Sequence, residues 1–511
     1  MSVELQLDPA RRMLVTIAVM LAVLIQVLDT TIANVALPHM QASLGATQES
    51  VNWVLTSYIV ASAIAIPIAG WLADRIGRKR LLVIAVIGFT IASLLCAVAQ
   101  NLSQMVAFRI IQGVTGAFLV PLAQATLFDI NPPARHAQAM ALFGGGIMIG
   151  PILGPLLGGW LTDSYNWRWV FLVNIPVGTL ATVMLLRYMP SIPLHRRKFD
   201  LIGFALIGLF LAGLQLMLDR GQQLDWFESW EIWIEAGVMA AALWMFLVHT
   251  VTTEHPLFER SMFTDRNFAT GLLFMAVTGV LLLAGLALLP PLLQRLYGYS
   301  VYQSGLLTMP RGIGTLISML TVGRMARYVD TRWLVALGMA LMGWSLHMMA
   351  GFALVQGAGP VVISGIIQGL GLGMLFVTIQ ALAFATLEPK QRTSAASLLN
   401  LARNVGGSVG ISLVASLLAR NLQTAHADMA GQITEQVLPG ITSGVVSQLG
   451  LPASAALAMA DAEINRQAAF IAYLDDFWIM MWLTFAAIPL VLLLRPARPA
   501  KPGEPQLAMA D

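Results

Sequence analysis

The chain has 511 residues, of which 58% are apolar and only 11% are charged, too few charges to cover a soluble protein of this length. The formal net charge of +3 does not indicate a nucleic-acid partner, because the basic residues gather at the ends of apolar runs. The single cysteine, Cys96, lies in an apolar run, which excludes a disulfide framework and a thiolate metal cluster. We therefore expect an all-α polytopic membrane protein surrounded by membrane lipid.

Fourteen apolar runs have the length of about 20 residues that a helix needs to cross the hydrocarbon core. The first run follows Arg11 and Arg12, is too long for a cleaved signal peptide and lacks a small-residue cleavage site, so we interpret it as an uncleaved span. A twelve-span alternative requires two runs to be dropped together. The predicted spans are 14–36, 52–73, 81–100, 102–128, 137–161, 168–189, 200–218, 231–250, 268–294, 302–324, 333–352, 359–385, 395–418 and 473–494.

The distribution of Lys and Arg gives the orientation, because these residues favour cytoplasmic loops. With the N-terminus inside, inner segments hold 21 of the 29 basic residues and outer segments hold five. We therefore predict that both termini, 1–13 and 495–511, are cytoplasmic. The longest predicted loop, 419–472, lies on the outer face. The other loops are short and leave no room for a soluble catalytic domain, so we do not expect an enzyme.

The two halves of the chain resemble each other. The sequence Ile-Ile-Gln-Gly at 110–113 recurs 256 residues later at 366–369, and Gln124 recurs at the same offset as Gln380. Chance resemblance between apolar helices is the alternative, but internal repeats are typical of transporters. We predict a six-helix bundle over 14–189, two inserted linker helices over 190–250 and a second six-helix bundle over 251–494.

Asp29 lies in the first span, in a run with no other charge between Arg12 and Glu49. An ionisable side chain there costs about 2.5–3.5 kcal/mol on insertion scales and indicates a functional site. Arg109 lies in the fourth span, and both residues are seven positions from the outer ends of their spans, a depth of about 10 Å.

From this matched depth we predict that Asp29 pairs with Arg109, exchanges the coupling proton and is linked by Arg109 to substrate binding. A buried ion pair that only fixes helix packing is the alternative. In the second half, Arg109 aligns with Gly365 and Asp29 aligns near Leu282, so the fold itself does not require the pair.

The inner loop between the second and third spans carries the pattern Gly-x-x-x-Asp-Arg-x-Gly-Arg-Lys, with a degenerate copy at 323–332. Its first glycine allows close helix approach, its aspartate is suited to capping a helix or pairing with an arginine, and its second glycine permits a tight turn. Its basic residues are also suited to anionic lipids. We predict a conformational latch built from Gly70, Asp74, Arg75, Gly77 and Arg78.

The fifth span carries a glycine every fourth residue, with two prolines between them. Glycines make a smooth face for close helix packing, and prolines bend a helix. Plain packing is the alternative, but the prolines favour a bend at the interface of the two halves. The residues of this motif are Gly146, Gly150, Pro151, Gly154, Pro155 and Gly158.

Other polar residues within spans are suited either to lining a substrate pathway or to joining helices, and the arginines among them either to the pathway or to snorkelling. The sequence shows no metal-ligand cluster, nucleotide-binding loop or nucleophile triad, so we expect no cofactor and a proton gradient as the energy source. The candidates for the substrate pathway are Gln26, Asn34, Gln112, Gln124, Arg311, Gln368, Gln380 and Arg403.

These motifs resemble those of the major facilitator superfamily over nearly the whole chain. The loop at 74–80 is similar to its signature motif, 109–113 to its proton-linked motif, and 150–159 to its antiporter motif. The segment 28–38 resembles the first-span motif of the fourteen-span drug:proton antiporters. The resemblance implies the major facilitator fold and a bacterial inner-membrane pump that exports hydrophobic drug-like compounds in exchange for protons.

The resemblance also implies a tripartite assembly with a periplasmic adaptor and an outer-membrane channel. We expect the adaptor to contact the loop 419–472; a merely solvated loop is the alternative. A metabolite or fatty-acid exporter on the same fold is the nearest rival function. A receptor or scaffold that has lost transport is disfavoured, because such a protein has no reason to keep Asp29 and Arg109 in the membrane.

Overall fold

The computed structural model describes residues 8–47, 50–132, 135–191, 198–326, 328–431 and 453–495, and every regular element within them is helical. Thirteen helical segments of this part of the chain are long and apolar enough to cross a membrane. The helix α7 (His136–Ser164), with 29 residues, lies among them in the chain. The predicted all-α membrane fold with fourteen spans is confirmed. We call the end of the molecule at which α1 begins the inner end and the opposite end the outer end.

The first half contains two spans that are broken near their middle. The second span passes through a 3-10 turn, η2 (Ile66–Ile68), around Pro67, which lacks the N–H that a continuous helix requires. The fourth span breaks at 117–118. The helices of this half are α1 (Pro9–Ser43), α2 (Trp53–Ala65), α3 (Ala69–Ile76), α4 (Arg78–Val98), α5 (Leu102–Gly116), α6 (Leu119–Ile130), α7, α8 (Trp169–Leu172) and α9 (Asn174–Tyr188).

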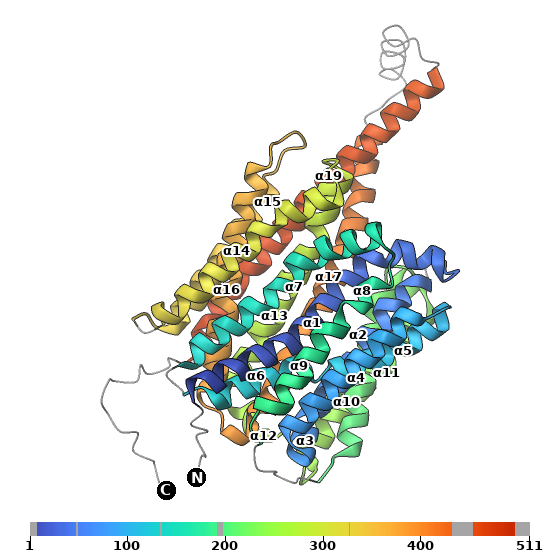
Figure 1. Cartoon of the computed structure of the whole chain (residues 1–511). Coiled ribbons are helices and arrows are strands. Elements are labelled where there is room, and N and C mark those ends of the chain that lie inside the picture. Colours follow the sequence, from blue (N-terminus) through green and yellow to red (C-terminus); the bar gives the residue numbers. More distant parts are fainter. Residues whose placement is uncertain are drawn as a thin grey trace.

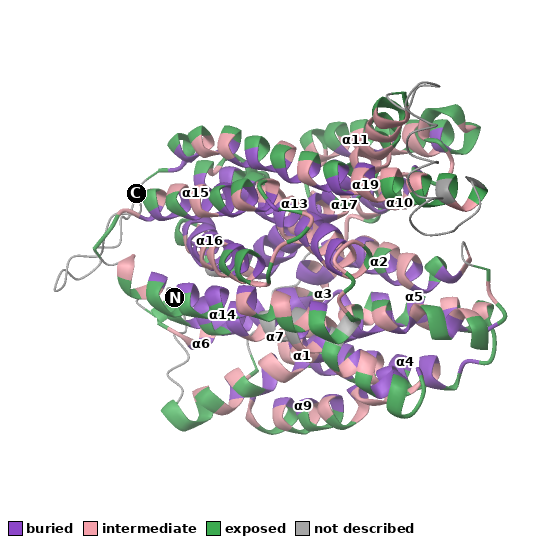
Figure 2. Ribbon diagram, turned by 90° about the horizontal axis from the view of Figure 1, so that it is seen from above, coloured by how far each residue is buried: buried purple, intermediate pink, exposed green. Residues whose placement is uncertain are grey.

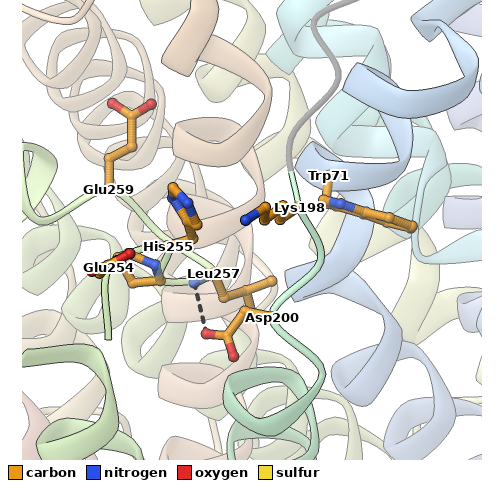
Figure 3. A pocket seen from close by; sticks show the side chains of 8 residues that line it. Trp71, Lys198, Asp200, Glu254, His255, Leu257 and Glu259 are labelled. Carbon is orange, nitrogen blue, oxygen red and sulfur yellow. Dashed lines mark hydrogen bonds between the residues drawn. The ribbon is translucent and has the colours of Figure 1, made fainter. Parts of the chain in front are cut away.

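Two inserted helices, α10 (Leu201–Arg220) and α11 (Trp230–Thr252), pack against each other, and α10 also packs against α2 and α17. At the inner end Asp200 caps α10, accepting a hydrogen bond from the backbone N–H of Gly203 at 2.8 Å. The same carboxylate contacts Nε2 of His249 at 2.7 Å and accepts from the N–H of Leu257 at 3.0 Å, which ties the connection after α11 to the start of α10. Figure 3 shows this corner, where Asp200 borders a surface hollow of about 410 Å³.

The second half lies beside the first, with α7 between α1 and α14 (Figure 1). Buried residues line the faces where the helices meet, and exposed ones cover the outside (Figure 2). The exposed face of α4 is a stripe of large apolar residues at helical spacing, which suits lipid contact: Ile84, Ile87, Ile91, Leu94 and Val98. The helices of the second half are α12 (Arg260–Thr264), α13 (Arg266–Arg295), α14 (Val301–Met325), α15 (Thr331–Ala350), α16 (Gly359–Ala385), α17 (Arg392–Gly431) and α19 (Ala453–Ala487), which continues as η6 (Ile488–Leu493).

The outer segment 419–472 is not the loop that we predicted. The helix α17 continues to Gly431 and α19 begins at Ala453, and both project beyond the bundle (Figure 1). Residues 419–430 and 453–472 contain neither Pro nor Gly and are rich in Ala, which favours helix even without apolar periodicity. Residues 432–452 lie outside the described part of the chain.

The glycine face of α7 packs against α1, not against the second half as we predicted. Cβ atoms added at three of the four glycines of this face would collide with side chains of α1, and one added at Gly158 would be in tight contact with Ile32. Thr31 on α1 donates a hydrogen bond to the carbonyl of Gly150 at 3.2 Å. The helix α7 does lie at the interface of the halves, but it meets α14 through Gly144 and Gly145, which face Met319 and Leu316. The helix continues through Pro151 and Pro155, whose side chains lie outside the description. The contacts on the glycine face pair Gly146 with Met20, Gly150 with Val27, Gly154 with Thr31 and Gly158 with Ile32.

Replacing Gly154 with Val should destabilise the protein, because the new Cβ would meet the Thr31 side chain. Overpacking of this kind costs about 1–3 kcal/mol. The neighbouring Gly159 is a matched control, since a Cβ there meets nothing within 4 Å. Thermal unfolding of the purified protein in detergent, followed by tryptophan fluorescence, should show a lower midpoint for Gly154→Val than for Gly159→Val. Equal midpoints would contradict the packing described.

Candidate functional site

Asp29 on α1 and Arg109 on α5 form an ion pair inside the first half. Both side chains are fully buried, and Nη1 of Arg109 lies 2.5 Å from Oδ2 of Asp29. The structure thus places in contact the two charges whose depths match in the sequence. Removing two charges from water is costly, and only good geometry with further hydrogen bonds compensates.

Two amide side chains bond directly to this pair, and one hydroxyl bonds to the second of them. Gln112 accepts from Nη1 of Arg109 at 2.8 Å and donates to Oδ1 of Asp29 at 2.8 Å. Asn174, at the start of α9, donates to the same Oδ1 at 3.1 Å and lies 3.0 Å from the hydroxyl of Ser93 on α4. Three spans therefore meet at one carboxylate, and a fourth, α4, is joined to it through Asn174. Gln112, which we assigned to the substrate pathway, belongs to this cluster.

Asn174 and Ser93 are functional-site residues that we did not predict. Asn174 lies six residues inside the outer end of the sixth span, close to the depth of Asp29. We compared the depths of charged residues only. Comparing the depths of all polar residues within spans would have found Asn174.

Aromatic rings enclose the guanidinium of Arg109. Its carbon lies 4.3 Å from the centre of the Tyr58 ring and 5.7 Å from that of Phe171. Such contacts stabilise a cation by about 2 kcal/mol when it is shielded from water. Its Nε donates to the carbonyl of Val54 at 2.9 Å. Tyr58 is also part of the wall of a cavity, so one side chain separates the ion pair from that space.

The cavity has a volume of about 430 Å³ and lies between the two halves and the inserted helix α10. Its wall is largely apolar, with a few polar groups, as in many sites for small hydrophobic ligands. Two of the predicted pathway residues, Gln26 and Arg403, line it, and so does Asp219, near the outer end of α10. Asn34 continues the stripe of α1 that lines the cavity one turn further out, where it is exposed.

The remaining pathway candidates lie elsewhere. Gln124 donates to Gln380 at 3.2 Å and accepts from Asn400 at 2.6 Å, which joins the first half to the second. Arg311 and Gln368 are buried together in the second half and are not part of the cavity wall. The predicted pathway is therefore divided into four separate polar groups, counting Gln112 at the ion pair.

The inner ends of the halves are held together around Asp129, a residue that we did not predict. Asp129 on α6 forms ion pairs with Arg78 and, at 3.0 Å, with Arg392 at the start of α17. Arg78 also donates to the Thr393 hydroxyl at 2.8 Å. These bonds hold the inner ends of the two halves together, and the cavity lies between them and the outer end.

The other residues of the predicted latch have different roles. A Cβ at Gly70 would collide with Ser394, so its lack of a side chain allows α17 to approach. Gly77 has a φ of +94° and makes the turn between α3 and α4, a conformation that favours glycine. Asp74 interacts electrostatically with Arg78. Arg75 is exposed, lies over the ring of Trp71 and does not contribute to the closure.

Comparisons with known proteins agree with this architecture. The family model described as Major Facilitator Superfamily matches residues 19–411. The multidrug export protein EmrB of Escherichia coli K12 is 34% identical over 498 residues, which cover 96% of this chain and 96% of that protein. The fatty acid resistance protein FarB of Neisseria gonorrhoeae is 35% identical over 486 residues, covering 94% and 96%.

Solved structures share the fold at low sequence identity. The human organic anion transporter MFSD10 superposes with a TM-score of 0.58 at 15% identity, over 94% of this chain and 100% of that chain. The proton:xylose symporter XylE gives 0.57 at 13% identity, over 94% and 97%. At these identities they show the fold alone, and the family follows from the sequence matches: this chain belongs to the major facilitator superfamily.

Proposed function

We propose that the protein is a proton-coupled multidrug exporter that moves hydrophobic compounds across the bacterial inner membrane, with its inner end and both termini in the cytoplasm. The observation that carries this proposal is the buried Asp29 carboxylate, bonded to Arg109 and separated by Tyr58 from an apolar cavity. The similarity to EmrB of Escherichia coli supports multidrug export. The excess of Lys and Arg in the inner segments supports the orientation.

Protonation of Asp29 links proton uptake to release of the exported compound. A neutral carboxyl no longer compensates the charge of Arg109, and leaving one partner of a buried pair alone costs about 3–5 kcal/mol. That cost favours rearrangement of α5 against α1, and through the Tyr58 ring it changes the cavity wall. A proton bound from outside therefore favours release of the compound, and loss of the proton inside restores the pair.

Alternating access requires the inner closure to open. The two halves rock about the cavity, as in other transporters with internal repeats. Breaking the contacts of Asp129 with Arg78 and Arg392 separates α6 and α4 from α17 at the inner end. Water can replace these polar contacts when the inner side opens, whereas the ring contact of Phe128 with Phe384 beside them has to separate.

The projecting helices α17 and α19 support a tripartite assembly. They extend beyond the outer end of the bundle, where a periplasmic adaptor of the EmrA type would contact them (Figure 1). The adaptor would connect the exporter to an outer-membrane channel of the TolC type. Export of a fatty acid or metabolite is the second candidate, supported by the similarity to FarB.

The variant Asp29→Asn should lose proton-coupled export, because an amide keeps the hydrogen bonds of the site but carries no exchangeable acid. Proton release on addition of drug to the purified protein should fall at least tenfold. Asp163→Asn, at the exposed end of α7, is the control and should behave as wild type. The double variant Asp29→Asn/Arg109→Gln separates loss of coupling from the cost of an unpaired arginine. Undiminished proton dependence in Asp29→Asn would refute the role of Asp29.

The variant Asp129→Asn should open the inner end, because Arg78 and Arg392 would then repel each other without a shared anion. A hydrogen bond to a charged group is worth about 1.5–3 kcal/mol, enough to shift the equilibrium about tenfold or more. A cysteine introduced by Ala125→Cys should react faster with a maleimide in inverted vesicles.

The matched control is Asp330→Asn. Asp330 pairs with Arg332 at 2.8 Å within one inner loop and does not join the halves, so its replacement should leave the labelling rate unchanged. Native Cys96 is buried and gives little background. If both variants label alike, Asp129 does not hold the closure.

Deleting residues 425–465 should abolish co-purification with the adaptor while leaving the unfolding midpoint of the membrane bundle close to that of wild type. The reason is that the described residues of the deleted part, 425–431 and 453–465, project from the bundle (Figure 1). Pull-down with a tagged EmrA-type adaptor measures the contact. An unchanged pull-down would place the contact elsewhere.

A further inference from the structure

The second half contains a buried guanidinium with no counter-charge. Arg311 on α14 is only 7% exposed, and its side chain has one hydrogen bond, a long one of 3.4 Å to the carbonyl of Leu282. In the part of the chain that the structure describes, Arg311 forms no ion pair. A buried charge without a partner is strongly unfavourable, so a group that supplies the missing negative charge would bind there with a large gain.

Next to it lies an amide that is also without partners. Gln368 on α16 is 1% exposed, and neither its Nε2 nor its Oε1 has a hydrogen-bond partner among the described residues. A Cβ added at Gly285 on α13 would lie 3.5 Å from Nε2 of Gln368 and 3.6 Å from Nη1 of Arg311. The two side chains therefore converge on one point beside Gly285, which suits an anion that accepts from both.

The internal repeat indicates that the group missing beside Arg311 and Gln368 is a carboxylate. With an offset of 253 residues, Asp29 corresponds to Leu282 and Tyr58 to Arg311, and with the later offset of 256, Gln112 corresponds to Gln368. In the first half the glutamine joins a guanidinium to a carboxylate. In the second half the glutamine and a guanidinium are both present, and a leucine stands where the carboxylate would be.

The site is close to the cavity. Leu282 and Leu286 on α13 line the cavity, and Gly285 between them has no side chain to cover Arg311. Arg403 is a cation in the cavity wall itself and forms no ion pair with the described residues. The carboxylate in the cavity wall is Asp219 on α10, which already accepts from Gln215 at 3.0 Å.

We propose that Arg311 and Gln368 form an anion subsite that receives the carboxylate of an amphipathic substrate whose apolar body lies in the cavity. The inference rests on the proposed export function and specifies its substrate class. The guanidinium donates to both carboxylate oxygens, the geometry that arginine favours, and the amide of Gln368 donates to one of them. Arg403 attracts the anion into the cavity, and Asp219 repels it from the α10 side, which orients the head group toward α13.

The test compares two ligands that differ in charge alone. Purified protein in nanodiscs is titrated with 1-naphthaleneacetate and with 1-naphthaleneacetamide, which has the same ring and no charge, and binding is measured by calorimetry. We expect Arg311→Gln to weaken the carboxylate at least tenfold, about 1.4 kcal/mol. Binding of the amide should change less than twofold. Arg311→Lys, which keeps the charge but not the paired donors, should lie between wild type and Arg311→Gln.

The variant Arg311→Gln removes an unpaired buried charge, so its unfolding midpoint should equal or exceed that of wild type. If it does not fold, Gln368→Leu is measured in the same assay and should weaken the carboxylate selectively. Equal carboxylate affinity in wild type and variants, or equal losses for both ligands, would overturn the proposal. The unfolding midpoint is also compared in chloride and in gluconate. A midpoint that is higher in chloride only for proteins that retain Arg311, with the same carboxylate affinity in all variants, would likewise overturn the proposal.

The assay needs neither a proton gradient nor transport. Asp163→Asn, at the exposed end of α7 and outside both the ion pair and the cavity wall, should leave the carboxylate binding unchanged. A failure of the subsite is therefore distinguishable from a failure of the proposed export. If wild type binds the carboxylate through Arg311 but exports nothing, the export proposal fails and the subsite stands.

Discussion

The burial of the Asp29–Arg109 pair is the constraint on which the rest of the first half depends. Two charges without access to water are stable only if their partners are held to within a few tenths of an ångström. The glycine face of α7 holds Asp29 in position on one side, since it contacts Val27, Thr31 and Ile32 on the turns of α1 around Asp29. The hydrogen bonds from α5 and α9 hold Asp29 in position on the other side. Close packing here therefore serves the electrostatics of one carboxylate.

The fourth span connects this pair to the inner closure. Arg109 and Gln112 lie on α5, whereas Gln124 and Asp129, which bond to the second half, lie on α6. The span breaks at 117–118, and the second span has its own break at η2, between Tyr58 and Gly70. Breaks in helices are the positions where segments change direction at low cost. The two breaks thus separate a part that contacts the Asp29–Arg109 pair from a part that holds the halves together, within the same two spans.

Much of the fold and of the site was predictable from the sequence, and the remainder has a definite physical reason. Hydropathy located the spans because the bilayer sets their length, and depth alone paired Asp29 with Arg109. Depth and periodicity do not show which helix a given face will contact, so the predicted partner of the glycine face was wrong. They also do not bring together residues 263 positions apart, such as Asp129 and Arg392. The projecting helices were missed because hydropathy ignores the helix propensity of polar, alanine-rich segments.

The two halves share their helices but not their charges, and this difference divides the work between them. In the first half, the buried guanidinium of Arg109 forms an ion pair with the carboxylate of Asp29. A proton is the simplest species that can alter that bond. The second half has a glutamine at the position that corresponds to Gln112 and a guanidinium, Arg311, at the position that corresponds to Tyr58, but it has Leu282 in place of the acid. Because α7 packs on α1 through one face and on α14 through another, a shift of either half is transmitted to the other. A repeat that has lost its symmetry in charge but not in packing can therefore couple a proton on one side to an anion on the other.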